Sequence, residues 1–394
     1  MLVIMEVFLM ITHLYNYDTA KNSWSDSLDI SLDSPNTLVI VFATSKIDLI
    51  RKPLDELVKS FKTSKIIGAS TSGEILKAEL KQDSMVVAII KFETTNIKLI
   101  TQKISSMSDS FEGGVHLSQK LIDEKLKAIF ILSDGLAVNG SQLTNGISSV
   151  LDESIVVTGG LAGDGSNFKN TWIIANGEIA THYITAVGFY GDNFHIGYGS
   201  EGGWDRLGIE RVVTKSKDNI LYELDGQPAL ELYKKYLGDK GKELPASGLL
   251  FPLEIKATSD TKESKVRTIL AVNEEENSII FAGDIPQGSY VTLMKANFDR
   301  LIDGATKAAA YVHLDEYNDE NIICIAISCV GRHLVLKQRT EEELEATLDT
   351  LPQKTKQIGF YSYGEISPLS SGRCDLHNQT MTLTLIWESD AFTS

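Results

Sequence analysis

The chain repeats one pattern three times, and this repetition constrains its fold more than any other feature. Each copy begins with an apolar, β-branched run, continues through a helical segment, and reaches a second strand that ends in glycines. Two copies share letters at that end, GASTSGEI at 68–75 and GFYSYGEI at 359–366. The first runs and second strands of the three copies are 38–45 and 65–75, 129–135 and 155–165, and 322–331 and 358–366.

Strands that alternate with helical segments predict an α/β protein, and the hairpin strands after each glycine turn predict mixed rather than purely parallel sheets. The expected fold class is therefore α/β, with mixed sheets built from repeated β-α-β-hairpin units. In the first copy the helix is predicted over 53–61, with Pro53 at its start. Further helices are predicted over 113–126, 142–151, 297–311 and 340–351.

A segment with a different pattern separates the second and third copies. Residues 221–239 read as a strand, a turn at Asp225-Gly226 and an amphipathic helix, and four more predicted strands follow it. We therefore predict two domains. Residues 1–215 hold two copies of the repeat, and residues 216–394 hold this insert and the third copy.

Charge excludes two classes of partner. Lys and Arg number 37 against 53 Asp and Glu, and the net charge of -16 repels nucleic acid and anionic membranes. Residues 1–11 are apolar, but Glu6 interrupts them and they are far shorter than the ~20 residues that cross a bilayer. We expect these residues to form an inner strand or to be an extension that results from a misplaced start codon. The 3 cysteines have no CxxC spacing, so we expect buried thiols in a cytoplasmic protein.

Polar side chains gather in the glycine turns that follow the second strands. Backbone N–H groups in such turns point outward, which is where α/β folds bind small ligands. The alternative is a set of tight turns whose side chains satisfy their own backbone. The residues predicted to bind are Ser70, Thr71, Ser72, Gly73 and Glu74 in the first copy, and Gly160, Gly163 and Asp164 in the second.

The last seventy residues bring a second polar set to strand ends. A donor-rich Arg, a carboxylate and a Tyr-His-Asn group suit a zwitterionic or carboxylate ligand. The alternative is an internal Arg–Glu pair, with His377 hydrogen-bonded in a turn. Thr380, Thr382 and Thr384 alternate with apolar residues, which predicts a half-buried strand with a wet threonine face. The binding set is Cys329, Arg332, Tyr363, Gly364, Glu365, His377 and Asn378.

No catalytic constellation is present in the sequence. The chain has no GxSxG, no GxxxxGK[ST] and no HExxH, and its glycines at 160–165 are not followed by a helix as a dinucleotide site requires. We therefore expect a binding protein and not an enzyme. An enzyme that acts on a small polar substrate through Cys329 or His377 is the alternative, and a pure scaffold is a third hypothesis.

These segments resemble the FIST family, which is named for F-box and intracellular signal transduction proteins. The resemblance runs from about Thr37 to Trp387. On the N-terminal side it lies in GASTSGEI, LSDGLAVNG and VVTGGLAGDGSNF. On the C-terminal side it lies in LYELDGQPALELYKKYLG, FPLEI, SCVGRHLVL, IGFYSYGEISP and LHNQTMTLT.

The resemblance implies a sensory module that binds a small ligand, with amino acids the usual proposal, and regulates a signalling protein such as a histidine kinase. Some stand-alone members bind haem and sense nitric oxide. For a haem iron the chemistry of the residues offers His377, with His333 or Cys329 as alternatives. A homo-oligomer is compatible with the sequence, and no F-box is visible in it.

Overall fold

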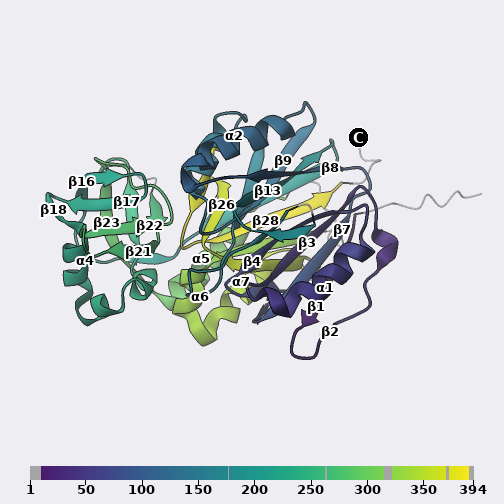
Figure 1. Ribbon diagram of the computed structural model, residues 1–394, viewed down its shortest axis with the longest axis horizontal. Coiled ribbons are helices and arrows are strands. Elements are labelled where there is room, and N and C mark those ends of the chain that lie inside the picture. The colour runs from purple at the N-terminus through teal and green to yellow at the C-terminus, as the bar shows by residue number, and fades with distance from the viewer. Residues whose placement is uncertain (1–9, 176, 262–263, 315–321, 370–371, 390–394) are drawn as a thin grey trace, which may run out of the picture.

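The computed structural model describes residues 10–175, 177–261, 264–314, 322–369 and 372–389. Three sheets form one body, and a fourth sheet lies to one side in an inserted domain, shown in green in Figure 1. We call residues 10–201 and 298–388 the body and residues 204–296 the insert domain. The predicted strand at 1–11 lies outside the described residues except at its last two positions.

Each sheet of the body is built on one copy of the repeat. Two parallel strands lie at its centre, and a third, antiparallel strand flanks the first of them. The mixed α/β fold predicted from the repeats is confirmed. The triplets are β3 (Thr37–Thr44), β4 (Lys65–Thr71) and β7 (Ser84–Lys91); β9 (Leu126–Ser133), β10 (Val156–Leu161) and β13 (Tyr183–Tyr190); and β24 (Ile323–Cys329), β25 (Lys356–Ser362) and β28 (Met381–Glu388).

The three copies exchange strands in a ring. The hairpin that follows the second strand of each copy pairs with the second strand of another copy. Thus β5 (Glu74–Leu76) and β6 (Glu79–Lys81) extend the third sheet beyond β25. Strands β11 (Ile173–Ala175) and β12 (Glu178–Ala180) extend the first sheet beyond β4, and β26 (Gly364–Pro368) and β27 (Cys374–His377) extend the second beyond β10.

Four further strands complete these sheets at their other edges. Strand β1 (Ile11–Asp18) pairs with β7 and with the short β2 (Ser23–Trp24). Strand β8 (Asn96–Lys103) follows the first copy but pairs with β13 of the second. Strand β14 (Phe194–Glu201) follows the second copy but pairs with β28 of the third. The sheets are therefore joined on both sides.

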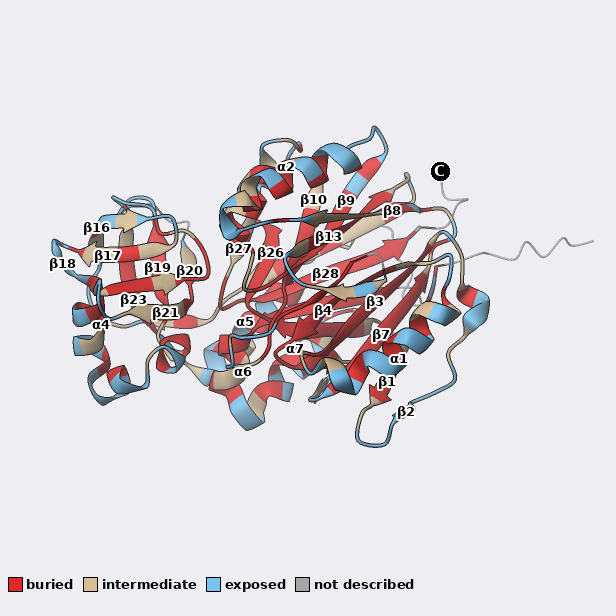
Figure 2. Cartoon of the chain, in the orientation of Figure 1, coloured by how far each residue is buried: buried red, intermediate tan, exposed pale blue. Residues whose placement is uncertain are grey.

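Helices cover the outer faces of the sheets, and apolar side chains fill the space between the sheets. Phe42 and Phe360 meet there with ring centroids 4.6 Å apart, and Phe130 and Ile325 belong to the same buried cluster. Figure 2 shows the central strands buried along most of their length. The helices are α1 (Ile47–Ser60), α2 (Ser110–Leu121), α3 (Gly140–Ser148), α5 (Phe298–Ala310), α6 (Val330–Leu336) and α7 (Thr340–Thr350).

The insert domain has its own sheet and its own core. Helix α4 (Ala229–Leu237) packs on that sheet, and Leu221, Leu230, Ile279 and Phe281 are among the buried residues between them. Its strands are β15 (Trp204–Arg206), β16 (Arg211–Lys217), β17 (Ile220–Leu224), β18 (Gln227–Pro228), β19 (Leu253–Lys256), β20 (Lys265–Arg267), β21 (Ile269–Asn273), β22 (Ser278–Phe281) and β23 (Tyr290–Ala296). The sheets do not follow the division at residues 215 and 216, which stays a prediction about folding units.

Two local predictions were wrong. Helix α1 begins at Ile47, so Pro53 lies inside it and not at its start. The proline lacks one backbone donor, and its ring is buried against the body, which offsets the lost hydrogen bond. Thr382 and Thr384 on β28 are buried and not on a wet face, because both faces of that sheet are covered.

Candidate ligand site

The three glycine turns meet, as their shared position at strand ends suggests. Ser72 N–H donates to the carbonyl of Tyr361 at 2.8 Å, Gly163 N–H to that of Ser70 at 2.9 Å, and Tyr363 N–H to that of Leu161 at 3.2 Å. The first copy thus donates to the third, the second copy donates to the first, and the third copy donates to the second. The turns therefore close the ring of copies at its centre.

The polar groups of the turns are buried and bonded to one another. Glu74 accepts from Thr71 Oγ1 at 2.5 Å and from Ser84 N and Oγ at 3.1 and 2.8 Å. Asp164 accepts from the backbone of Phe168 at 2.8 Å. In this arrangement the turns expose little to a ligand, which favours the structural interpretation. Ser70, Thr71, Ser72, Gly73, Glu74, Gly160, Gly163, Asp164, Tyr363, Gly364 and Glu365 are all buried.

Glu365 repeats the arrangement of Glu74 in the third copy. One carboxylate oxygen accepts from Ser362 Oγ at 2.5 Å, and the other accepts from Thr380 N and Oγ1 at 3.2 and 3.0 Å. Burial raises the pKa of Glu74 to about 7 and that of Glu365 to about 8, although their donors act in the opposite direction. Each carboxyl group fixes the start of the next long strand.

Arg332 forms an internal ion pair, the alternative that the sequence left open. Its guanidinium donates to Glu343 Oε2 from Nε at 3.0 Å and from Nη2 at 2.8 Å, and both side chains are fully buried. Tyr363 Oη donates to the Asp164 carboxylate, and Asn378 Nδ2 donates to the carbonyl of Tyr363 at 3.3 Å. Arg332, Tyr363 and Asn378 are therefore committed to the interior.

A different region offers space for a ligand. A hollow of about 700 Å³ lies between the insert domain and the body, and we call it the interdomain cleft. The body lines it with Ser141 and Asn145 on α3 and with Leu369, Arg373 and Asp375 around β27. The insert domain lines it with Ile255, Ala257, Thr261, Lys265, Arg267, Asp284, Pro286, Gln287, Gly288 and Ser289.

Charged groups of both signs face the interdomain cleft. Lys265 of the insert domain forms an ion pair with Asp375 of the body. Burial lowers the pKa of Arg267, and its Nη1 donates to the carbonyl of Leu376 at 3.0 Å. Burial opposes ionisation of Asp375, but Arg267 and Lys265 outweigh it and lower the pKa of Asp375. Three cations and two carboxylates thus line the cleft, which suits a polar ligand that carries charge.

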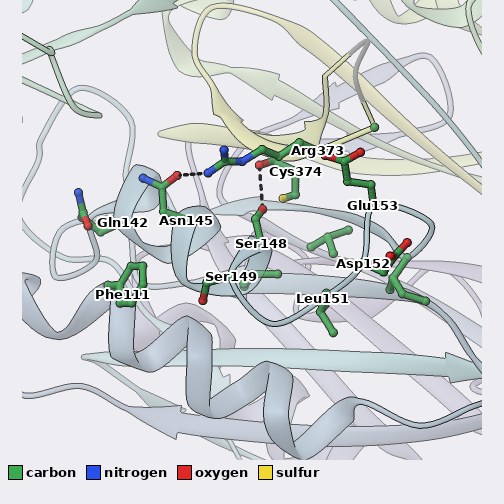
Figure 3. A pocket seen from close by; sticks show the side chains of 14 residues that line it. Phe111, Gln142, Asn145, Ser148, Ser149, Leu151, Asp152, Glu153, Arg373 and Cys374 are labelled. Atoms are coloured by element: carbon green, nitrogen blue, oxygen red, sulfur yellow. Dashed lines mark hydrogen bonds between the residues drawn. The ribbon is translucent and has the colours of Figure 1, made fainter.

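A second hollow of about 530 Å³ adjoins the cleft and shares Asn145 and Arg373 with it. Figure 3 shows Arg373 directed at Asn145 across this hollow, with Nη2 3.0 Å from Asn145 Oδ1. Arg373 is exposed, and this neutral acceptor occupies only part of its guanidinium. Asp152 and Glu153 also line the hollow, and Glu153 lies beside Gly372, the neighbour of Arg373.

The three residues considered for a haem iron are buried or half-buried in this arrangement. Burial raises the pKa of the Cys329 thiol, which opposes the thiolate that iron needs. His377 Nε2 donates to the carbonyl of Ser367 at 3.1 Å, which leaves Nδ1 as the nitrogen with a lone pair. His333 has Nδ1 3.1 Å from Thr340 Oγ1 and Nε2 3.2 Å from Gln82 Nε2. None of the three lines either hollow.

Within the described part of the chain, no group of three or more His, Cys, Asp or Glu is placed to hold a metal ion. No helix in the same residues is long and apolar enough to cross a membrane.

Sequence reasoning missed the residues of the cleft. Lys265, Arg267, Asp284 and Arg373 lie in three segments that show no shared motif. One signal was available at 283–290, where the sequence GDIPQGSY marks a turn between two strands of the insert domain. Which surface that turn contacts is decided only by the packing of the insert domain on the body.

The fold and the cleft together define a class of protein. It has an α/β body built from three copies of one repeat, an inserted β domain, and a charged cleft between the two. The sequence profile of the FIST N domain matches residues 37–227, and that of the FIST C domain matches residues 229–368. The chain belongs to the FIST family, whose domains are associated with sensory roles in signal transduction. It is also similar to a Methanocaldococcus jannaschii protein described only as uncharacterized, at 25% identity over 95% of this chain and 79% of the relative.

Proposed function

We propose that this protein senses a small amino-acid-like ligand in the interdomain cleft and regulates a signalling partner such as a histidine kinase. The observation that supports the proposal is the cleft itself, which both the body and the insert domain line with charged side chains. A ligand that contacts both walls reports on their relative position, which is what a sensor requires.

The charges of the cleft favour a ligand with a carboxylate and an ammonium group. Arg373 has guanidinium donors beyond its one bond to Asn145, and a carboxylate is the natural bidentate partner of such a group. Asp375 supplies an acceptor for an ammonium group within the same hollow. A hollow of about 700 Å³ is within the ordinary size range of small-molecule sites.

Thermal unfolding with each standard amino acid tests the ligand. A true ligand raises the melting temperature in proportion to the logarithm of its concentration, without turnover. Arg373→Gln should remove that rise, whereas Arg51→Gln, on the exposed side of α1, should keep it. The proposal fails if no amino acid stabilises the wild-type protein, or if the rise survives in Arg373→Gln.

We propose that the protein binds its ligand without catalysis, and the surroundings of the two candidate catalytic residues support this. Cys329 is fully buried with a raised thiol pKa, and His377 is held by a backbone carbonyl. Haem and nitric oxide sensing stays a prediction from the family resemblance. A visible spectrum after expression with haem precursor tests it, and absence of a Soret band would rule it out.

A further inference from the structure

The insert domain is joined to the body by two chain crossings, and one buried side chain bonds to the first crossing and to the start of α5, which follows the second. Arg332 Nη1 donates to the carbonyl of Gly202 at 2.6 Å, and Nη2 donates to that of Leu301 at 2.7 Å. The crossings also touch directly, because a Cβ on Gly203 would lie 2.2 Å from the carbonyl oxygen of Arg300. The buried ion pair with Glu343 fixes this guanidinium, so the two crossings form a firm pivot.

A second set of contacts, made only of polar groups, joins the insert domain to α3 across the cleft. Asp284 Oδ1 accepts from Asn139 Nδ2 at 2.9 Å, and Oδ2 accepts from Gln142 Nε2 at 2.5 Å. The backbone N–H of Asp284 also donates to Ser141 Oγ at 3.2 Å. Asn139 is the N-cap of α3, so the carboxylate of Asp284 lies at the positive end of that helix.

These contacts differ from the pivot in how easily they can open. Asp284 is half-buried, and its side-chain bonds cross between parts of the chain that no covalent link holds together there. Water can replace such bonds at modest cost, whereas the pivot contains a fully buried ion pair and both chain crossings. The insert domain can part from α3 while its crossings stay in place, provided that the buried Arg267 also releases Ser141 Oγ and the carbonyl of Leu376, to which it donates at 3.4 and 3.0 Å.

We propose that Asp284 is a latch that sets the position of the insert domain, and that the ligand of the interdomain cleft acts by strengthening this latch. The role given to the ligand here rests on the proposed function. A ligand can touch Arg373 on the body and Lys265 on the insert domain together only while the latch holds the two walls at their present separation. Ligand binding and latch closure must then favour each other reciprocally.

Hydrogen exchange of the full-length protein tests the latch without a ligand. In Asp284→Ala and in Gln142→Ala, amides at 139–148 and 283–289 should exchange about tenfold faster than in wild type, while the pivot around 202–204 stays protected. Combining the two substitutions should add little to the effect of Asp284→Ala, because Asp284→Ala already removes the bond to Gln142. Asp239→Ala is the matched control, since Asp239 pairs with Lys242 within the insert domain and its side chain is 98% exposed.

L-alanine serves as the probe for the ligand clause. It should slow exchange at 283–289, and Asp284→Ala should weaken its binding about tenfold. Exchange in Asp284→Ala equal to that in Asp239→Ala would overturn the latch. L-alanine that binds the wild type and Asp284→Ala equally would overturn the coupling. If L-alanine does not bind the wild type, the proposed function fails for this ligand, and the exchange rates alone decide the latch.

Discussion

At the scale of single residues, two glutamates share one structural role. Glu74 and Glu365 each accept from a hydroxyl three residues earlier and from the first backbone N–H and hydroxyl of the next long strand segment. Both lie in the GEI end of the repeat, where the sequence also predicted ligand contacts. Their hydrogen bonds explain the repeated carboxylate without any ligand.

These carboxyl groups make stability depend on pH. The folded protein holds the Glu365 proton more tightly than the unfolded chain, because burial raises the pKa from 4.5 to about 8. The stability contributed is complete below the unfolded value and is lost as pH rises towards the folded one, by at most about 1.4 kcal/mol per pH unit. Glu365→Gln should flatten this decline in urea midpoints measured between about pH 5 and about pH 9. An unchanged slope would contradict the assignment.

A second prediction at the scale of single residues concerns Arg332. Arg332→Met leaves the Glu343 carboxylate buried without its cation and frees the carbonyls of Gly202 and Leu301, so the free energy of unfolding should fall by about 3 to 5 kcal/mol. Adding Glu343→Leu should restore part of the loss, because it removes the unpaired charge. Urea unfolding of both variants measures this, with Arg339→Met as the exposed control. A double variant less stable than Arg332→Met would argue against it.

At the scale of elements, the close spacing of each parallel pair depends on a glycine in its second strand. A Cβ on Gly68, Gly159 or Gly359 would lie 2.6, 1.8 or 1.7 Å from a carbonyl oxygen of the first strand. These three glycines occupy the same place in the three copies. Part of the glycine content is therefore explained by strand packing and not by ligand binding.

Gly359→Ala should accordingly disturb the parallel pair β24 and β25. The strands must separate to admit the methyl group, and we expect a loss of at least about 1 to 3 kcal/mol in the free energy of unfolding. Gly241→Ala is the matched control, since its nearest neighbour would be 3.4 Å away. Equal melting temperatures for the two variants would show that the strands tolerate the added carbon.

At the scale of the whole molecule, the ring of exchanged hairpins makes the third copy part of the same body as the first two. Strand β10 is hydrogen-bonded to β26, β25 to β5, and β14 to β28. These pairs join residues as far apart in the sequence as Glu74 and Phe360. Fragment 1–215 would leave β14 without its partner and would expose one edge each of β5 and β10.

We therefore expect fragment 1–215 to lack a cooperative unfolding transition by circular dichroism. Fragment 204–296 should show one, because its strands pair with one another and enclose their own core. A fragment 1–215 that unfolds as sharply as the full chain would show that the division at residues 215 and 216 separates true folding units.

Periodicity and turn residues were enough to predict the three parallel pairs and most helices. Those signals are local, because a buried strand and an amphipathic helix each leave a pattern within a dozen residues. The start of α1 was misjudged, because Pro53 is also tolerated inside a helix when its ring is buried. The burial of Thr382 and Thr384 could not be read from alternation, which does not reveal what covers a polar face.

The sequence by itself determined the repeat, the α/β class, the acidic surface and membership of a sensory family. Only the tertiary structure decided which sheet edge each hairpin joins. Backbone hydrogen bonds between strands use the same N–H and carbonyl groups in almost every residue, so the side chains do not reveal the partner strand. The same reason applies to the cleft. Its charged residues come from β20, from Arg373 and Asp375 around β27 and from the turn at Asp284, and only the packing of the insert domain on the body brings them together.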